Sequence, residues 1–206
     1  MERPLPDPLP LFPLQTVLFP GGLLRLRVFE ARYLDLVGHC LRSGEPFGVV
    51  AIRDGHEVRR AGEPLLIERV GVLAWVDEVD ADQPGLLQLR CHGSGRITLG
   101  AASQRADGLW LAPATPRADD VPTPVPATLQ PCADALGRAI AALASQGQQP
   151  FLTPHALHDA GWVANRWCEL LPLPQAARQR LMELDDPLAR LQQVDDFLRR
   201  EQVIGD

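Results

Sequence analysis

Proline alternates with large apolar residues near the start of the chain, in the segment Pro8–Leu14. Because proline has no backbone N–H to donate to a β-ladder, this segment predicts an extended chain at the edge of a sheet, packed against a core. Phe19–Gly22 then predicts a turn, since glycine readily adopts the positive φ that many turns require. Apolar and arginine side chains alternate from Leu24 to Val28, as in a strand exposed on one face. Glu30–Tyr33 begins a helical pattern.

The next eighty or so residues predict one helix and then many short strands. Apolar residues recur at helical spacing from Leu34 to Leu41, and Gly44 stands where a helix would end. Short apolar or alternating runs separated by turn signals continue from Phe47 to Leu111, which favours an antiparallel barrel or sandwich. The polar stretch Asp77–Gly85 predicts a loop, and Gly93–Gly95 predicts a glycine-eased turn or bulge.

Six prolines between Pro113 and Pro131 predict a semi-rigid connector. Beyond it the apolar period changes to that of helices. The sequence therefore predicts an α+β chain: a β-rich pseudo-barrel with one early helix over residues 1–118, a connector over 119–131, and a bundle of about four helices over 132–206.

Two helix starts are predicted inside the bundle. Thr153-Pro154 and Asp186-Pro187 each place a capping side chain before a proline at the first helical position.

The segment 9–33 resembles a known family. The resemblance rests on short motifs in order, namely Leu11-Phe12-Pro13-Leu14, Phe19-Pro20-Gly21, Leu24-Arg25-Leu26 and Phe29-Glu30-Ala31-Arg32-Tyr33. They resemble the opening of the Lon protease N-terminal (substrate-binding) domain family. Gly93–Ile97 is similar to that family's glycine-rich turn, except that Ile97 replaces an aromatic residue, and Leu170–Leu173, Arg180–Leu184 and Arg190-Leu191 are similar to its closing helices. The resemblance implies a PUA-like barrel, then helices, and binding of protein substrates.

All twenty basic residues are arginine, and the sequence contains no lysine. A full-length Lon protease needs one lysine to bind nucleotide phosphate and another as the base for its catalytic serine. The chain therefore resembles the family's binding domain standing alone, and we expect it to be no enzyme and to need no cofactor.

Net charge, hydropathy and cysteine spacing limit the expected partners, the expected location and the expected state of the cysteines. A net charge of −6 argues against nucleic acid as a partner. No apolar run is long enough to span a membrane and no signal peptide is evident, so the expected location is the cytoplasm. The cysteines are far apart and are expected to be buried thiols rather than disulfides: Cys40, Cys91, Cys132 and Cys168.

Two constellations suggest chemistry, and each has a simpler structural interpretation. His92–Gly95 contains a serine flanked by glycines, yet both flanks predict strand, so a turn or bulge is favoured over a nucleophile. His155 and His158, with Asp159, form half of a metal site on a predicted helix, but no third ligand follows at suitable spacing. We therefore expect no catalytic residue and no metal ligand.

Six residues are candidates for binding. Glu30, Arg32 and Tyr33 either shape a recognition surface or, as the position at a strand-to-helix corner favours, fix that corner by ion pairs or cap hydrogen bonds. The other candidates are aromatic residues of the kind that anchor interfaces, although core packing is their commoner role: Trp110, Trp162 and Trp167.

These observations favour non-catalytic binding of unfolded or flexible protein segments, with a protease or chaperone system as a further partner. An apolar groove between barrel and bundle would hold hydrophobic side chains, and exposed strand edges would add main-chain hydrogen bonds. The oligomeric state is left open. Three alternatives remain at this point: a PUA-like RNA-binding module, a barrel that binds a small molecule, and a hydrolase with an unrecognised site.

Overall fold

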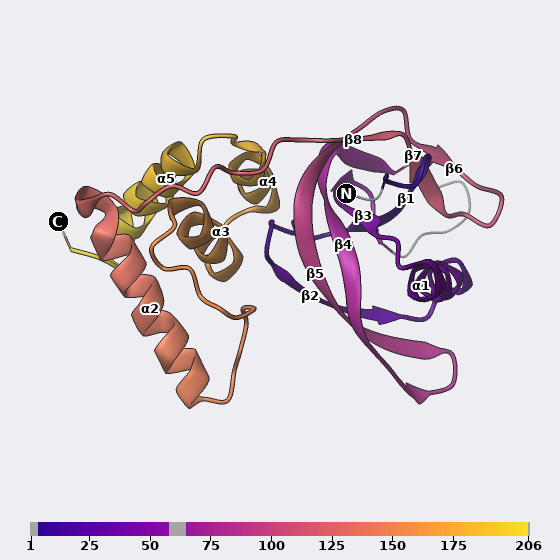
Figure 1. The fold of residues 1–206 in the computed structure, drawn as a ribbon, viewed down its shortest axis with the longest axis horizontal. Coiled ribbons are helices and arrows are strands. Elements are labelled where there is room, and N and C mark those ends of the chain that lie inside the picture. The colour runs from indigo at the N-terminus through magenta and orange to yellow at the C-terminus, as the bar shows by residue number, and fades with distance from the viewer. Residues whose placement is uncertain (1–3, 58–64, 206) are drawn as a thin grey trace. The chain divides into compact units, whose positions relative to one another are not determined.

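The computed structural model describes residues 4–57 and 65–205, and the chain divides after Ala118 into two compact units (Figure 1). The first unit is a curled sheet of eight strands with one helix among the described residues. Its elements are β1 (Leu9–Leu14), β2 (Leu23–Val28), α1 (Ala31–Ser43), β3 (Phe47–Asp54), β4 (Leu66–Gln83), β5 (Leu86–Leu99), β6 (Ser103–Gln104), β7 (Trp110–Ala112) and β8 (Ala114–Pro116).

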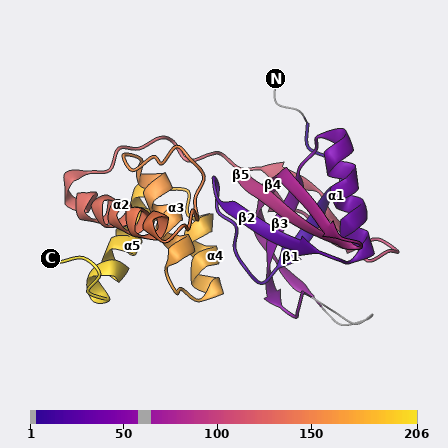
Figure 2. The same ribbon diagram turned by 90° about the horizontal axis from the view of Figure 1, so that it is seen from below.

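The strands follow the order β2-β5-β4-β3-β1-β7-β6, and β8 pairs with β5. Figure 2 shows β1 to β5 of this sheet together with α1. All neighbours are antiparallel except β1 and β3, which run parallel. The mixed sheet with one early helix, followed by a helical unit, confirms the predicted α+β class. Among the described strands, β2 has β5 as its single neighbour, so β2 forms an edge of the sheet.

The prediction that Pro8–Leu14 lies at a sheet edge is wrong, although its extended conformation is confirmed. Strand β1 lies inside the sheet because it has a neighbour on each side, β3 and β7. Each of these neighbours pairs with only part of β1. β7 pairs with Leu9–Leu11, and β3 pairs with Leu11–Leu14. Pro10 therefore lacks a partner on β3 and Pro13 lacks one on β7, so each proline lies where one side of the ladder does not demand a donor.

Both faces of β1 are buried, which makes this strand central to the packing of the unit. One face joins a core cluster that includes Leu11, Val50 and Ile97. On the other face the ring of Phe12 stacks on that of Tyr33 from α1, with ring centroids 4.0 Å apart. The alternation of apolar residues in β1 thus holds the sheet on one side and the helix on the other.

The end of α1 confirms one prediction, and the course of β4 corrects another. Gly44 caps α1 in the left-handed conformation, with φ of 64°. The predicted loop at Asp77–Gly85 is wrong, because β4 continues to Gln83 and the turn is confined to the residues around Gly85, whose φ is 78°. Residues 78–80 pair with 88–90 of β5, and this long-range pairing outweighs their polar composition.

A β-bulge interrupts β5 at the glycines, as predicted. The register between β4 and β5 shifts between Val72 and Ala74, opposite the stretch Gly93–Arg96. Gly93 also forms two backbone hydrogen bonds with the turn that precedes β2. Its amide donates to the Gly22 carbonyl at 2.8 Å, and its carbonyl accepts the Gly21 amide at 2.9 Å. The bulge therefore positions the start of β2 against β5.

We expect Gly93→Ala to lower the free energy of unfolding by about 1–3 kcal/mol. A Cβ at Gly93 would lie 2.6 Å from the backbone oxygen of Phe19, which is too close for a real contact. Gly100→Ala is the matched control, because its Cβ would meet Pro113 at an ordinary 3.4 Å. Urea unfolding of the two variants measures the difference. Equal free energies of unfolding for the two variants would show that the Phe19 backbone does not pack closely against Gly93 of β5.

The second unit contains a short 3-10 helix and four α-helices among its described residues. They are η1 (Ala127–Leu129), α2 (Gln130–Ser145), α3 (Ala160–Leu170), α4 (Gln175–Glu183) and α5 (Pro187–Arg200). The predicted start of the last helix is confirmed, since the Asp186 carboxylate accepts the amides of Leu188 and Ala189 at 2.9 and 3.3 Å.

The predicted helix start at Thr153-Pro154 is wrong, because α3 begins at Ala160. Asp159 is the actual N-cap, and its carboxylate accepts the amide of Trp162 at 2.7 Å and that of Thr123 at 2.9 Å. The Ala160 amide also donates to the Thr123 carbonyl. The connector thus engages the chain just before α3, and this tertiary pairing displaces the local capping signal.

Candidate functional site

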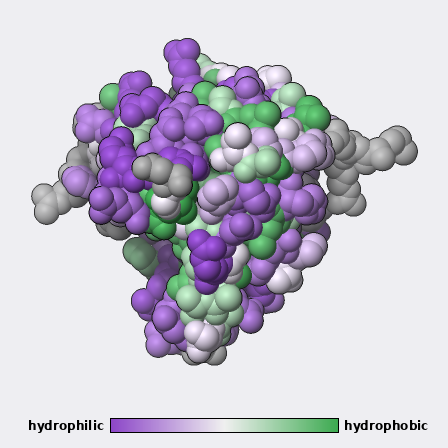
Figure 3. Space-filling model, turned by 90° about the vertical axis from the view of Figure 1, so that its left-hand side faces the viewer, coloured by the Kyte–Doolittle hydropathy of each residue, from purple (hydrophilic) through white to green (hydrophobic). Residues whose placement is uncertain are grey.

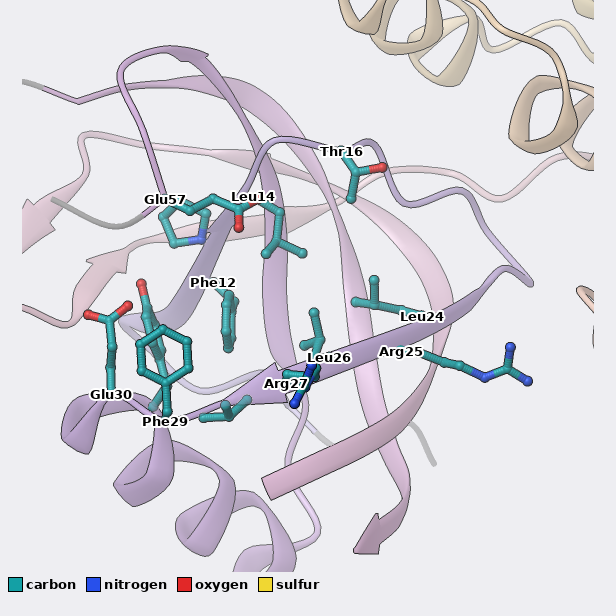
Figure 4. Close-up of a pocket in the computed structure, with 13 residues that line it drawn as sticks. Phe12, Leu14, Thr16, Leu24, Arg25, Leu26, Arg27, Phe29, Glu30 and Glu57 are labelled. Atoms are coloured by element: carbon teal, nitrogen blue, oxygen red, sulfur yellow. The ribbon is translucent and has the colours of Figure 1, made fainter. Parts of the chain in front are cut away.

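The best-defined pocket of the first unit has a volume of about 340 Å³ and lies between β1 and β2 (Figure 4). With one exception its lining comes from a single segment, 12–33, which holds the end of β1, the following turn, β2 and the start of α1. The lining residues are Phe12, Pro13, Leu14, Thr16, Leu24, Arg25, Leu26, Arg27, Val28, Phe29, Glu30, Tyr33 and Glu57. The pocket is thus built almost entirely by the segment whose motifs resemble the Lon N-terminal domain family, residues 9–33.

The apolar walls follow from the alternation in β2. Leu24 and Val28 are buried and Leu26 is partly buried, whereas Arg25 and Arg27 are exposed. Figure 4 shows Phe12, Leu24 and Leu26 around the cavity and the side chain of Arg25 pointing away from it.

The pocket also lies along the open edge of β2. Its lining includes every residue from Leu24 to Val28, although their side chains alternate between the two faces of the sheet. Consecutive residues can line one cavity in this way when the cavity runs beside the backbone. The free edge of the strand therefore forms part of the pocket wall.

Phe29 is the most exposed large apolar residue at this site, with 57% of its surface accessible. It follows Val28, which is 2% exposed, at the corner between β2 and α1. An aromatic side chain on the rim of an apolar pocket is a typical anchor for a bound chain. Phe29 was not among the predicted binding residues, because the sequence pattern alone does not show which side of the corner faces solvent.

Glu30 and Tyr33 line the pocket, whereas Arg32 does not. Arg32 forms an ion pair with Glu30, and its guanidinium lies 5.0 Å from the centre of the Tyr33 ring. Glu30 precedes α1 without a cap hydrogen bond from its side chain. The ion pair, rather than a cap, is the contact that these residues make at the corner.

The three tryptophans that were candidates for binding lie outside this pocket. Trp110 on β7 packs against the core cluster of the sheet. Trp167 on α3 is 5% exposed, and its indole N–H donates to the Cys132 carbonyl at 3.0 Å. These contacts agree with the packing role that was weighed for both residues.

Trp162 belongs to a cluster around a buried arginine. The Arg166 guanidinium lies 5.8 Å from the Trp162 ring and 5.7 Å from the Phe151 ring, and it pairs with Glu169 at 2.9 Å. Burial raises the pKa of Glu169 to about 7. All of these residues belong to the helical unit, where they hold α3 against the preceding loop.

The helical unit has a hollow of its own, of about 400 Å³, between α4 and α5. Its lining mixes apolar and charged side chains, namely Leu171, Leu173, Pro174, Ala177, Arg180, Leu181, Gln193, Val194, Asp196, Phe197 and Arg200. Figure 3 shows hydrophilic and hydrophobic residues interspersed on the face of the molecule that carries this unit.

The serine and histidine residues that suggested a catalytic or metal site make other contacts or lie outside the predicted helix. The Ser94 hydroxyl accepts the Trp75 indole N–H at 3.0 Å, while His92 bonds to Asp77 at 2.6 Å, so serine and histidine do not form a dyad. His155 and His158 lie before α3 rather than on it. In the parts of the chain that the structure describes, no three His, Cys, Asp or Glu residues gather as a metal site.

The four cysteines are free and buried, as predicted. Burial raises the pKa of each thiol, for example to about 12 for Cys91 and to about 11 for Cys40. These thiols stay protonated at neutral pH, which makes them poor nucleophiles and poor metal ligands.

Comparison with known proteins gives the chain a family. Residues 8–200 match the ATP-dependent protease La (LON) substrate-binding domain. The chain is similar to the crystal structure of a Lon N-terminal domain protein from Xanthomonas campestris, with 33% identity over 92% of this chain and 97% of that chain, and a TM-score of 0.75. The N-terminal domain of Mycobacterium avium complex Lon protease shares the fold at 14% identity, covering 92% of this chain and 96% of that chain, with a TM-score of 0.59. No curated protein matches.

None of the described helices is long and apolar enough to span a bilayer.

Proposed function

Because this chain belongs to the family of ATP-dependent protease La (LON) substrate-binding domains, we propose that it binds unfolded or flexible protein segments at the β1–β2 pocket, without catalysing a reaction on them. Family membership agrees with the resemblance of residues 9–33, and those residues build the pocket. A protease or chaperone that receives the bound segment is part of the same proposal.

The observation that carries the proposal is a partly apolar cavity with an exposed aromatic side chain on its rim, beside an open strand edge. The cavity offers Phe12, Leu24 and Leu26 to a hydrophobic side chain, and Phe29 extends that surface to solvent. A strand edge binds any extended backbone, because main-chain hydrogen bonds do not depend on side-chain identity. Folded proteins seldom offer both an apolar side chain and an unpaired backbone, so unfolded segments are the expected ligands.

A single pocket of this size predicts weak binding. A Kd on the order of 10 μM corresponds to about −7 kcal/mol, which several copies acting together would strengthen. The test compares one probe protein in two states: reduced and alkylated so that it cannot refold, or native with its disulfides intact. We expect the unfolded probe to bind at least about tenfold more tightly in fluorescence anisotropy, since the native probe buries its apolar side chains. Equal affinities, or no binding of the unfolded probe, would contradict the proposal.

A further inference from the structure

We propose that the open edge of β2 takes up an extended segment in which acidic residues alternate with large apolar ones. This inference rests on the proposed function, because it names the class of segment that the pocket would select. It arises from three features of β2: the direction of its backbone groups, the difference between its two faces, and the charge that it presents.

The pairing of β2 with β5 determines which backbone groups face the open edge. The Gly93 amide donates to the Gly22 carbonyl at 2.8 Å, and the register pairs Leu24 with Cys91 and Leu26 with Leu89. Hydrogen-bonded and non-bonded pairs alternate along an antiparallel ladder. The backbone groups of Leu24 and Leu26 thus point to β5, and those of Arg25 and Arg27 point to the edge.

An added strand would continue the pleat of β2, so its side chains would alternate between two hollows. On the inner face lies the 340 Å³ pocket, which is lined by Phe12, Leu24, Leu26 and Phe29 and suits a large apolar side chain. On the outer face a shallow depression of about 820 Å³ runs over β2, β5 and β4. Both hollows include the residues from Arg25 to Arg27, as expected if both open on the same strand edge.

The outer hollow is lined by three arginines and by two acidic residues on β4, Glu78 and Asp80, so its positive charge lies on the side of β2. Arg90, which stands opposite Arg25 on β5, forms an ion pair with Glu78 at 2.8 Å. Arg25 and Arg27 are exposed and make no ion pair with any residue the structure describes. Opposite charges that face each other on neighbouring strands attract, so acidic residues are the complement that these two arginines would select.

The same charges argue against a second copy of this chain as the occupant. Two β2 strands that paired edge to edge with their leucines on the pocket side would place Arg25 and Arg27 beside the arginines of the other copy. Like charges across a strand pair are destabilising, and edge charges of this kind prevent self-association. An acidic and apolar segment satisfies both faces, whereas a second β2 satisfies only the inner one.

The test uses three acetylated peptides of six residues, the length of β2, in which leucine alternates with aspartate, serine or lysine. We expect the aspartate peptide to bind about tenfold more tightly than the serine peptide, and the lysine peptide to bind most weakly. The preference should fall to about twofold near 1 M salt, where the screening length is about 3 Å.

The double variant Arg25→Gln/Arg27→Gln should bind the aspartate and serine peptides equally, because the acidic side chains then face no arginine. Arg42→Gln/Arg53→Gln is the matched control, because it removes the same charge from exposed residues of the first unit outside both hollows. Peptides N-methylated at alternate residues test the backbone contact. Methylation of the residues whose amides face β2 should abolish binding, and methylation of the residues between them should leave binding unchanged.

Each outcome separates this inference from the proposed function. Equal binding of all three peptides, or tolerance of N-methylation at both sets of residues, overturns the inference and leaves the proposed function standing. A preference for aspartate that persists in the Arg25→Gln/Arg27→Gln variant also overturns it, because another surface would then select the charge. Absence of binding by every peptide, together with no binding of the unfolded probe protein, overturns both.

Discussion

Replacing Arg190 with methionine is expected to destabilise the helical unit by about 3–5 kcal/mol. The Arg190 side chain is 1% exposed, and its guanidinium donates to Asp120 at 2.6 and 3.2 Å. It also donates to Asn165 at 3.0 Å, to the Leu181 carbonyl at 2.9 Å and to the Leu184 carbonyl. Methionine fills a similar volume but leaves the carboxylate and two backbone carbonyls without this donor.

The position of Arg190 explains why so large an effect is expected. It lies on α5 and binds Asn165 of α3, the end of α4, and Asp120 in the connector, so one side chain joins most of the unit. Urea unfolding followed by helical circular dichroism measures the loss. Arg200→Met is the matched control on the same helix, because the Arg200 side chain is 68% exposed.

A double-variant cycle separates the ion pair from the packing. Adding Asp120→Asn to Arg190→Met should restore part of the lost stability, because it removes the negative charge that the Arg190 guanidinium no longer balances in the single variant. A loss below about 1 kcal/mol for Arg190→Met, which is the size of an exposed ion pair, would contradict this account.

Replacing Phe29 with glutamine is expected to weaken binding of an unfolded probe about tenfold, the effect of removing one aromatic anchor. Stability should hardly change, because Phe29 is already 57% exposed. The variant therefore separates binding from folding. Fluorescence anisotropy measures the affinity, and the thermal midpoint of unfolding confirms that the fold is intact.

Leu41→Gln is the matched control for Phe29→Gln. Leu41 is 55% exposed in the same unit but lies at the other end of α1, outside the pocket. Its substitution removes a similar area of exposed apolar surface, so any general hydrophobic attraction would fall equally in the two variants. Equal affinities for the two variants would show that the probe does not bind at the β1–β2 pocket.

Local signals predicted those features that depend on a few neighbouring residues. Gly44 ends α1 because a left-handed residue there satisfies the last turn, and Asp186 starts α5 because its carboxylate reaches the first free amides. The bulge at Gly93–Gly95 likewise follows from glycine within an otherwise regular strand pattern. None of these features requires knowledge of the rest of the chain.

Predictions failed where distant segments pair. The segment Pro8–Leu14 is interior because β3 and β7 each cover half of it, and sequence order does not reveal that arrangement. Residues 77–83 are a strand because β5 pairs with them, despite their polar composition. α3 starts at Ala160 rather than after Thr153 because the connector bonds to the chain near Asp159.

The candidate site was predicted in part. The sequence singled out the segment that builds the pocket, and Glu30 and Tyr33 lie in its lining. The binding role of these residues stays a prediction. Phe29 and the open edge of β2 were missed because exposure at a corner and the absence of a neighbouring strand are properties of the folded sheet.

The most direct test of the account maps the bound segment onto the chain by amide chemical shifts. We would titrate ¹⁵N-labelled protein with the peptide of alternating leucine and aspartate. The account predicts shift changes concentrated in Phe12–Thr16 and Leu24–Glu30, the walls of the β1–β2 pocket. Changes concentrated instead between Leu171 and Arg200, around the α4–α5 hollow, would contradict it.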